Sequence, residues 1–175
     1  MTQTRGQHVD LVAHIRLATS VDAAIIARLM EESFAQYREL YTVAGYRAIA
    51  LSDEQIIDRM KEGPVWVALV NERIDATVAV VGKAQSLYLR GMAVRPSARG
   101  QHLGKLLLNC IERFATREGF ERMFLSTTPF LDRAIRLYEG FGFKRTDEGP
   151  HDLHGTPLFT MEKITGQPRQ IDSRT

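Results

Sequence analysis

Apolar positions recur along the chain at two periods, one of two residues and one of three to four, and each period predicts a different element. Short runs rich in β-branched and aromatic residues, separated by polar turns, predict strands. Seven such runs are present, at 14–18, 65–70, 74–82, 86–94, 121–128, 143–146 and 157–164.

Two helices are expected in the first third of the chain. Thr19 with Asp22, and Ser52 with Gln55, have the spacing of capping boxes, which mark helix N-termini. Apolar residues follow each box at helical spacing. The stretch 34–51 between them carries three tyrosines and a glycine, and its pattern predicts a loop or a broken helix.

Two more helices are predicted after the strand at 86–94. Residues 129–143 predict the last helix, with Pro129 in its first turn. The helix before it is expected to end at Gly119, since glycine favours the left-handed conformation that terminates helices. Its apolar stripe consists of Leu103, Leu106, Leu107, Cys110, Ile111 and Phe114.

The order of these elements predicts the architecture. Consecutive hairpins give antiparallel strand pairs, whereas the strand-helix-strand crossover over 86–128 gives a parallel pair. We therefore expect an α/β (α+β) fold, with a mixed, mostly antiparallel sheet of about seven strands flanked by about four helices. Residues 1–164 are predicted to form one domain, and 165–175 a polar tail.

Composition narrows the function classes. The chain has 175 residues, a formal net charge of +2 and one cysteine. So small a net charge argues against nucleic acid as a partner, while a pI near 8.8 permits an anionic ligand. No apolar stretch approaches the roughly 20 residues of a membrane span, and the N-terminus lacks the apolar core of a signal peptide. A cytoplasmic location without membrane attachment is expected.

A basic loop with two glycines lies where the strand at 86–94 gives way to a helix. It carries Arg99, Gly100, Gly104 and Lys105. Helix N-termini expose unpaired N–H groups and a partial positive charge, and glycines allow close approach, so this loop predicts a phosphate site. The glycine spacing matches neither a Walker A loop nor a dinucleotide fingerprint.

The segment "MAVRPSARGQHLGKLLL" resembles the acetyl-CoA-binding motif of the GNAT superfamily of N-acetyltransferases. The family frame of Arg or Gln, two residues, Gly, one residue and Gly or Ala falls on residues 99–104, with His102 in place of the middle glycine. The resemblance implies a GNAT-like fold and acetyl-CoA as cosubstrate. The cofactor-binding residues that it implies are Met92, Ala93, Val94, Arg99, Gly100, Gln101, His102, Leu103, Gly104 and Lys105.

The resemblance continues in "RAIRLYEGFGF", where the family carries a tyrosine beside the cofactor thiol. That position is Tyr138, which the resemblance implies as the catalytic residue. Where the family often has an asparagine, this chain has Leu131. A strand N–H near Met92–Val94 would donate to the thioester oxygen.

Two other features permit chemistry, but simpler interpretations are stronger. Cys110 lies on an apolar helical stripe, which indicates a buried small side chain rather than a nucleophile. His151 and His154 stand in one loop without further spaced ligands, so no metal site is predicted. These histidines could instead border the acceptor pocket.

The acceptor pocket has no motif. We expect the segment 34–51, the second helix and the loop 147–156 to build it. Two alternatives stay open for the tyrosines of the first segment, namely lining the pocket or packing against the sheet. Glu31 and Glu32 are possible general bases, as is water. The tyrosines concerned are Tyr37, Tyr41 and Tyr46.

The leading hypothesis is an N-acetyltransferase that moves an acetyl group directly from acetyl-CoA to a primary amine of a small molecule or peptide. One alternative is a non-catalytic acyl-CoA sensor. The other is acetylation of charged tRNA, which requires a basic face. A homodimer is compatible with the fold, although no sequence feature requires one. The arginines available for a basic face are Arg28, Arg38, Arg47, Arg59 and Arg73.

Overall fold

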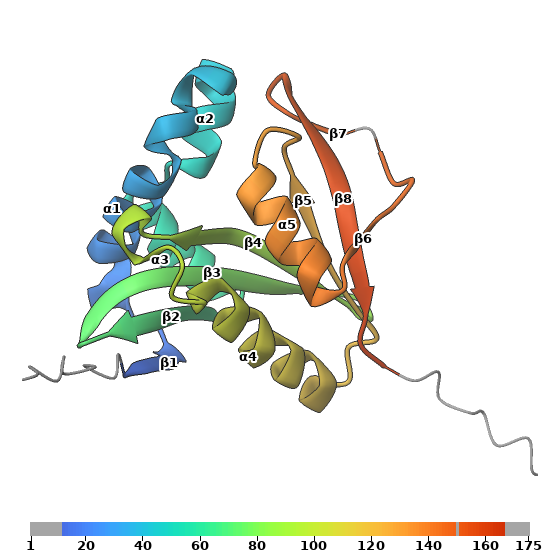
Figure 1. Ribbon diagram of the computed structural model, residues 1–175. Helices are drawn as coiled ribbons and strands as arrows, with labels where there is room; N and C mark the ends of the chain where they lie inside the picture. The colour runs from blue at the N-terminus through green and yellow to red at the C-terminus, as the bar shows by residue number, and fades with distance from the viewer. Residues whose placement is uncertain (1–11, 150, 167–175) are drawn as a thin grey trace, which may run out of the picture.

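A computed structural model describes residues 12–149 and 151–166. Its centre is an eight-stranded sheet in the order β1-β2-β3-β4-β5-β8-β6, with β7 paired to β8 beside this path (Figure 1). The β4–β5 pair is parallel and the other pairs are antiparallel, as predicted. The strands are β1 (Ala13–Leu17), β2 (Val65–Val70), β3 (Arg73–Lys83), β4 (Ser86–Val94), β5 (Arg122–Thr127), β6 (Lys144–Arg145), β7 (His151–Leu153) and β8 (Thr156–Ile164).

Helices cover both faces of the sheet. One face carries α1 and α3, and the other carries α4 and α5 (Figure 1). The α-helices are α1 (Ala23–Phe34), α2 (Val43–Ile49), α3 (Asp53–Glu62), α4 (Leu103–Glu118) and α5 (Asp132–Phe141). Short 3-10 helices are η1 (Ser20–Asp22), η2 (Ala35–Leu40) and η3 (Pro96–Ala98). The predicted fold class is confirmed.

Three features of the secondary structure differ from the predictions. The segment 34–51 contains η2 and α2, because the Thr42 side chain accepts a hydrogen bond from Gly45 N–H and so caps a short helix. β7 was not predicted, since its three residues carry no clear alternation. Pro129 is not in the first turn of α5, because Leu131 has a non-helical backbone and the helix begins at Asp132.

Both predicted capping boxes are present. Asp22 Oδ2 accepts from Thr19 N–H at 2.8 Å, and Gln55 Oε1 accepts from Ser52 N–H at 2.9 Å. Asp22 also pairs with Arg16 of β1 at 2.8 Å. The start of α1 is thereby tied to the edge of the sheet.

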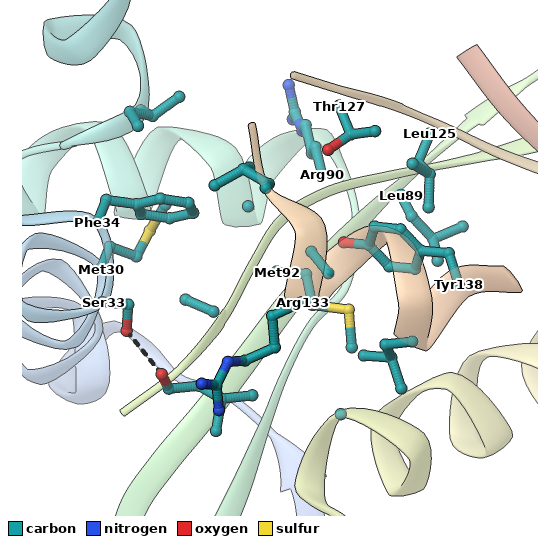
Figure 2. Close-up of a pocket in the computed structure, with 18 of the residues that line it drawn as sticks. Met30, Ser33, Phe34, Leu89, Arg90, Met92, Leu125, Thr127, Arg133 and Tyr138 are labelled. Carbon is teal, nitrogen blue, oxygen red and sulfur yellow. Dashed lines mark hydrogen bonds between the residues drawn. The ribbon is translucent and has the colours of Figure 1, made fainter. Parts of the chain in front are cut away.

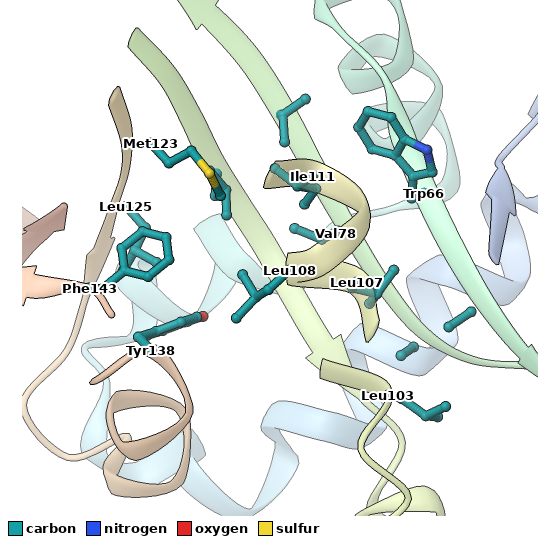
Figure 3. Packing of buried hydrophobic residues seen from close by; sticks show 14 of the residues in the cluster. Trp66, Val78, Leu103, Leu107, Leu108, Ile111, Met123, Leu125, Tyr138 and Phe143 are labelled. Atoms are coloured by element: carbon teal, nitrogen blue, oxygen red, sulfur yellow. The ribbon is translucent and has the colours of Figure 1, made fainter. Parts of the chain in front are cut away.

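The core between the sheet and α4 positions the rest of the molecule. Leu103, Leu107, Leu108 and Ile111 of α4 are fully buried against β2–β5 and α5 (Figure 3). Leu106, which the predicted stripe included, is instead 37 % exposed. The buried face of the helix includes Leu108 in place of Leu106, so it is rotated slightly from the predicted stripe. Gly119 ends the helix at φ 79°, as predicted.

Only residues 165–166 of the predicted tail can be described, because residues 167–175 lie outside the described ranges. Thr165, assigned to the tail, donates its N–H to Glu121 O at 3.0 Å and its hydroxyl to Phe120 O at 2.8 Å. This first tail residue is therefore attached to the end of the sheet.

Candidate active site

The parallel strands β4 and β5 separate halfway along their length. Their pairing covers only Ser86–Leu89 against Arg122–Leu125. Beyond Leu89, β4 stays paired with β3 up to Val94, and β5 stays paired with β8 (Figure 1). The facing backbone edges of the two strands therefore have no strand partner in this region. Val94 O accepts from the Ser33 hydroxyl at 3.1 Å, and the other N–H and C=O groups along these edges are available to a ligand.

A β-bulge marks the point of separation. Ala79 of β3 lies opposite Arg90, and Thr77 lies opposite Ala93, so β4 contains one residue more than β3 over this interval. Gly91 falls within the bulge and has φ 61°, the left-handed region that glycine adopts most readily. The bulge lies immediately before Met92–Val94, the part of β4 that borders the gap.

A cavity of about 570 Å³ occupies this gap, a size typical of small-molecule sites. Its wall is formed by β4, β5, the ends of α1 and α3, η2, α2, the start of α4, α5 and the hairpin of β7 and β8. Of the predicted cofactor-binding and catalytic residues, Gln101 is the one that is not part of the wall. Those that are part of it are Met92, Ala93, Val94, Arg99, Gly100, His102, Leu103, Gly104, Lys105 and Tyr138.

The basic loop lies at one end of the cavity. It leads into the sixteen-residue helix α4, whose first N–H groups are not paired within the helix. Gly100 has φ 84° and His102 has φ 59°, so both adopt the left-handed conformation. The family frame has glycine where His102 stands. The backbone there is left-handed, a conformation that glycine adopts most readily, and the imidazole is exposed.

Arg99 and Lys105 differ in how they are held. The Arg99 guanidinium donates to Ser33 O at the end of α1, at 3.2 Å. The Gln36 amide oxygen, turned toward it, accepts from both Arg99 Nη atoms at 2.9 and 3.0 Å. Lys105 is exposed and has no carboxylate within 4.0 Å among the described residues. One cation is thus fixed in place, and the other is free to follow a ligand.

Tyr138 lies at the middle of the cavity, on the α5 side. Its ring is buried and packs against Phe143, with ring centroids 5.9 Å apart. Its hydroxyl points toward the gap between β4 and β5 (Figure 2). Burial raises the pKa of Tyr138 well above its ordinary value, so the phenol stays protonated at neutral pH.

Aromatic side chains form a further part of the cavity wall. Tyr41 packs edge-on against Phe130, with centroids 4.8 Å apart, and burial raises its pKa to about 12. Tyr37 and Tyr41 line the cavity, whereas Tyr46 does not. Tyr46 donates to Glu31 Oε1 at 3.2 Å and lies under the Arg38 guanidinium, at 5.0 Å. Two of the three tyrosines thus line the pocket, and the third, Tyr46, packs against Glu31 and Arg38 outside it.

The β7–β8 hairpin closes this part of the wall against α2. Thr42 N–H donates to Thr156 Oγ1 at 2.9 Å, and the Thr42 hydroxyl donates to His154 O at 2.7 Å. The close contact needs Gly45, because a Cβ there would lie 2.8 Å from Leu153 O. Leu153 faces the cavity, whereas the exposed His154 is not part of the wall.

The described residues that line the cavity include no aspartate or glutamate. Glu31 accepts the Tyr46 hydroxyl, and Glu32 pairs with Arg95, so both suggested bases are engaged outside the wall. The charged residues of the wall are cationic, namely Arg59, Arg90, Arg99, Lys105 and Arg133. A substrate proton therefore has no carboxylate acceptor in this cavity.

The sequence analysis did not predict that Arg59 and Arg90 would lie together in the cavity wall. Arg59 lies three residues after Ile56, on the inward face of α3, and Arg90 interrupts the apolar run of β4. An arginine on an otherwise apolar face was the available signal. Both lie far along the chain from the motif of the basic loop.

Other sequence features lie outside the cavity. Cys110 of α4 is half-buried against the core. Burial raises the pKa of its thiol, which fits an inert apolar role. Within 12–149 and 151–166, no three His, Cys, Asp or Glu side chains gather as metal ligands would. Each helix in these ranges is too short or too polar to cross a bilayer.

Solved structures share this architecture at low sequence identity. The PaiA N-acetyltransferase of Thermoplasma acidophilum, in complex with coenzyme A, superposes with a TM-score of 0.76 at 18 % identity, over 88 % of this chain and 99 % of that one. The YncA putative acetyltransferase of Salmonella typhimurium, with acetyl-CoA, gives 0.67 at 19 % identity, over 93 % and 99 %. At these identities the likeness establishes the fold.

Sequence relatives give the family. An uncharacterised N-acetyltransferase of Schizosaccharomyces pombe is 39 % identical over 64 residues, which is 37 % of this chain and 39 % of that protein. The probable N-acetyltransferase camello of Xenopus laevis is 32 % identical over 106 residues, 57 % of this chain and 44 % of that protein. The chain thus spans less than half the length of both relatives. The model of the Acetyltransferase (GNAT) family matches residues 26–143, more than half of the chain, which therefore belongs to that family.

Proposed function

We propose that the protein is an N-acetyltransferase that moves an acetyl group from acetyl-CoA to a primary amine of a small molecule or peptide by direct transfer. One observation carries this proposal. The free strand edges beyond Leu89 and Leu125, the basic loop before α4 and the hydroxyl of Tyr138 all face the same cavity. Each has the chemistry that a different part of this reaction requires.

The basic loop would hold the pyrophosphate. The free N–H groups of α4 and the helix dipole favour an anion at this place, and Arg99 and Lys105 add two full positive charges. The bonds from Arg99 to Ser33 and Gln36 keep its guanidinium beside the end of α1. A charge that is already oriented loses little entropy when the ligand binds.

The separated strands would orient the acetyl thioester. Acetyl-CoA supplies an activated acetyl group and a thiolate leaving group. Between Met92 and Val94, the backbone N–H groups that face the β5 side have no strand partner there, so they would donate to the thioester oxygen as negative charge develops on it. Thioester and amine, held in one cavity, gain rate chiefly from their positioning.

The proton balance assigns a role to Tyr138. The amine nitrogen forms a bond to the acetyl carbon, the carbon–sulfur bond breaks, and one proton passes overall from nitrogen to sulfur. The raised pKa of Tyr138 exceeds the roughly 8.5 of a thiol, so the phenol would stabilise the thiolate as a hydrogen-bond donor rather than by complete proton transfer. With no carboxylate in the wall, water would accept the proton of the amine.

Replacement of Tyr138 tests this role. In Tyr138→Phe we expect kcat to fall by about 100-fold, while acetyl-CoA affinity changes less than about threefold, because the hydroxyl acts mainly on the leaving thiolate. The measurement is free-thiol release from acetyl-CoA with a panel of amines, amino acids and peptides, beside calorimetric binding of acetyl-CoA.

Tyr46→Phe is the matched control, since Tyr46 is also buried but lies outside the cavity wall. It should retain kcat within about twofold, because it loses only the hydrogen bond to Glu31. An unchanged kcat in Tyr138→Phe would remove this tyrosine from the mechanism. Acetyl-CoA binding without thiol release for any acceptor would favour the sensor over the transferase.

A further inference from the structure

Arg59 is a cation of the cavity wall with which no carboxylate of the described residues forms an ion pair. Its half-buried side chain extends from α3 into the cavity wall. Within the described ranges it has no carboxylate within 4.0 Å and no side-chain hydrogen bond. Burial, and then the nearby charge of Arg90, lower the pKa of Arg59 to about 10. A guanidinium removed from water in this way gains from an anionic partner.

Arg90 has one donor engaged and one free. Its Nη2 donates to Glu62 Oε2 at 2.7 Å, whereas its Nε is buried without a partner. Because this Nε is fully buried, Arg90 contributes its positive charge to the cavity wall rather than this N–H group. Arg59 therefore presents unused donors to the cavity, and Arg90, which also lines it, adds a second positive charge nearby.

The charge of this cluster identifies the class of anion. Two arginines and Glu62 together carry a net charge of +1. A monoanionic carboxylate balances this charge, whereas a phosphate would leave excess negative charge in a partly buried site. The planar fork of an arginine also matches the two oxygens of a carboxylate.

The position of Arg59 relates this anion to the reaction. Its Nη1 lies against Gly91, so closely that a Cβ on Gly91 would overlap it. Gly91 immediately precedes the backbone that we assign to the thioester oxygen. The basic loop lies beyond Val94, about 13 Å of strand further along from Arg90. In Figure 2, Arg90 lies near the top of the view and Ser33 at the left, below Met30.

The neighbouring wall is apolar. Met30 Cε lies 3.4 Å from the same Cβ position on Gly91, and Phe34 and Ile49 continue the surface toward α2. A substituent of the acceptor beside the arginines would therefore contact apolar side chains. Polycationic acceptors need acidic partners, and the described residues of the wall include no carboxylate, which disfavours such acceptors.

We propose that Arg59 and Arg90 bind a carboxylate of the acceptor, so that the amine substrate is a free α-amino acid with an apolar side chain. This inference rests on the proposed acetyl transfer and narrows its substrate class. A carboxylate on Arg59, beside the bulge, leaves the α-amino group one carbon away, next to the thioester. Arg59 acts here as a specificity-determining residue.

The test compares acceptors that differ only in the carboxylate. Thiol release from acetyl-CoA is measured with L-leucine, L-leucinamide and 3-methylbutylamine, and with the matching phenylalanine series. We expect kcat/KM for the acids to exceed that for the amides by at least about 10-fold. In Arg59→Gln this preference should fall by about 10- to 100-fold, because charge-assisted hydrogen bonds are lost. Comparing one acid–amide pair across variants cancels the difference in amine basicity.

Two variants control for other effects. Arg28→Gln removes an exposed arginine of α1 that lies outside the cavity wall, and it should keep the wild-type preference. Arg59→Lys keeps the charge but not the planar fork, so it should give an intermediate preference. Calorimetric affinity for acetyl-CoA should be the same in all variants, since the pyrophosphate end is unchanged.

The outcomes separate this inference from the proposed function. Turnover of amides or simple amines at rates equal to those of the acids would overturn the carboxylate site and leave the transferase intact. Without turnover of any probe, the protein saturated with coenzyme A is titrated with N-acetyl-leucine and with N-acetyl-leucinamide. Selective binding of the acid, lost in Arg59→Gln, would support the site, whereas equal binding or none would overturn it.

Discussion

The two ends of the cavity are built in different ways. The end that would hold the cofactor comes almost entirely from one continuous segment, residues 92–105, in which a strand end, a glycine loop and a helix start follow one another. The end that would hold the acceptor is assembled from α1, η2, α2, α3 and the β7–β8 hairpin. These elements lie far apart along the chain, as the contact between Thr42 and Thr156 illustrates, since these residues are 114 positions apart.

This difference separates cofactor binding, for which the chain carries the family motif, from acceptor binding, for which it carries no motif. A pyrophosphate needs backbone donors and two cations, which one loop can supply. An acceptor needs a pocket of a given shape and charge, which only tertiary contacts provide. Changes at the first end should therefore affect acetyl-CoA binding, and changes at the second should affect substrate choice or the packing of α1 and α2.

The largest effect is expected at the cofactor end. A Cβ on buried Gly104 would lie 2.6 Å from Leu137 Cδ2 and 3.6 Å from Met92 Cε. Gly104→Val would therefore push α5 away and obstruct the first turn of α4. We expect acetyl-CoA affinity to fall by about 100-fold, and stability by about 1–3 kcal/mol, as calorimetry and urea unfolding would measure.

Gly140→Val is the matched control, because Gly140 lies on the exposed side of α5 with nothing within 4 Å of its Cβ position. Its stability should change by less than about 1 kcal/mol, and acetyl-CoA affinity should be unchanged. Wild-type affinity in Gly104→Val would show that close approach to Gly104 is not needed at this end.

A smaller effect is expected at the start of α1, which carries part of the acceptor wall. The hydrogen bonds from Arg16 lower the pKa of Asp22 from 3.8 to about 2. A carboxyl whose pKa is lower when folded adds stability above its unfolded pKa, and this contribution is lost as pH falls through the folded value. In Asp22→Asn we expect a loss of about 1–2 kcal/mol at pH 7.

Urea unfolding at a series of pH values measures this effect. Between pH 4 and pH 2 the wild type should lose stability more steeply than Asp22→Asn, so that the two curves converge in acid. Parallel curves over this interval would mean that the Arg16–Asp22 pair does not anchor α1 as described.

The smallest effect concerns His102. Its φ of 59° is tolerated by histidine but disfavours β-branched residues. His102→Val should cost about 1–2 kcal/mol of stability, while His102→Gly should change it by less than about 1 kcal/mol. Thermal unfolding compares the two. Acetyl-CoA affinity that drops in His102→Gly would instead reveal a direct contact between imidazole and phosphate.

Much of the fold and of the cofactor end could be predicted because both depend on local pattern. The capping residues Asp22 and Gln55, the helix-ending Gly119 and the crossover over 86–128 are visible in the sequence. The loop from Arg99 to Lys105 needed no tertiary information.

The other features of the fold and of the site could not be predicted, because they depend on contacts between residues far apart in the sequence. α2 is stabilised by its cap at Thr42 and by contact with Thr156, which local propensity does not report. Arg59 and Arg90 become a pair only when α3 packs beside β4. The partners of Glu31 and Glu32, which remove both from the list of bases, likewise come from other elements.

The short pairing of β4 with β5 also makes the cosubstrate a factor in folding. Four residue pairs between these strands join two halves of the sheet, one formed by β1–β4 and the other by β5, β6 and β8. A ligand between the separated strands would add cross-links to both halves. At 100 times its dissociation constant it would stabilise the native state by about 2.7 kcal/mol. The cellular supply of acetyl-CoA would then govern the lifetime of the protein as well as its rate of turnover.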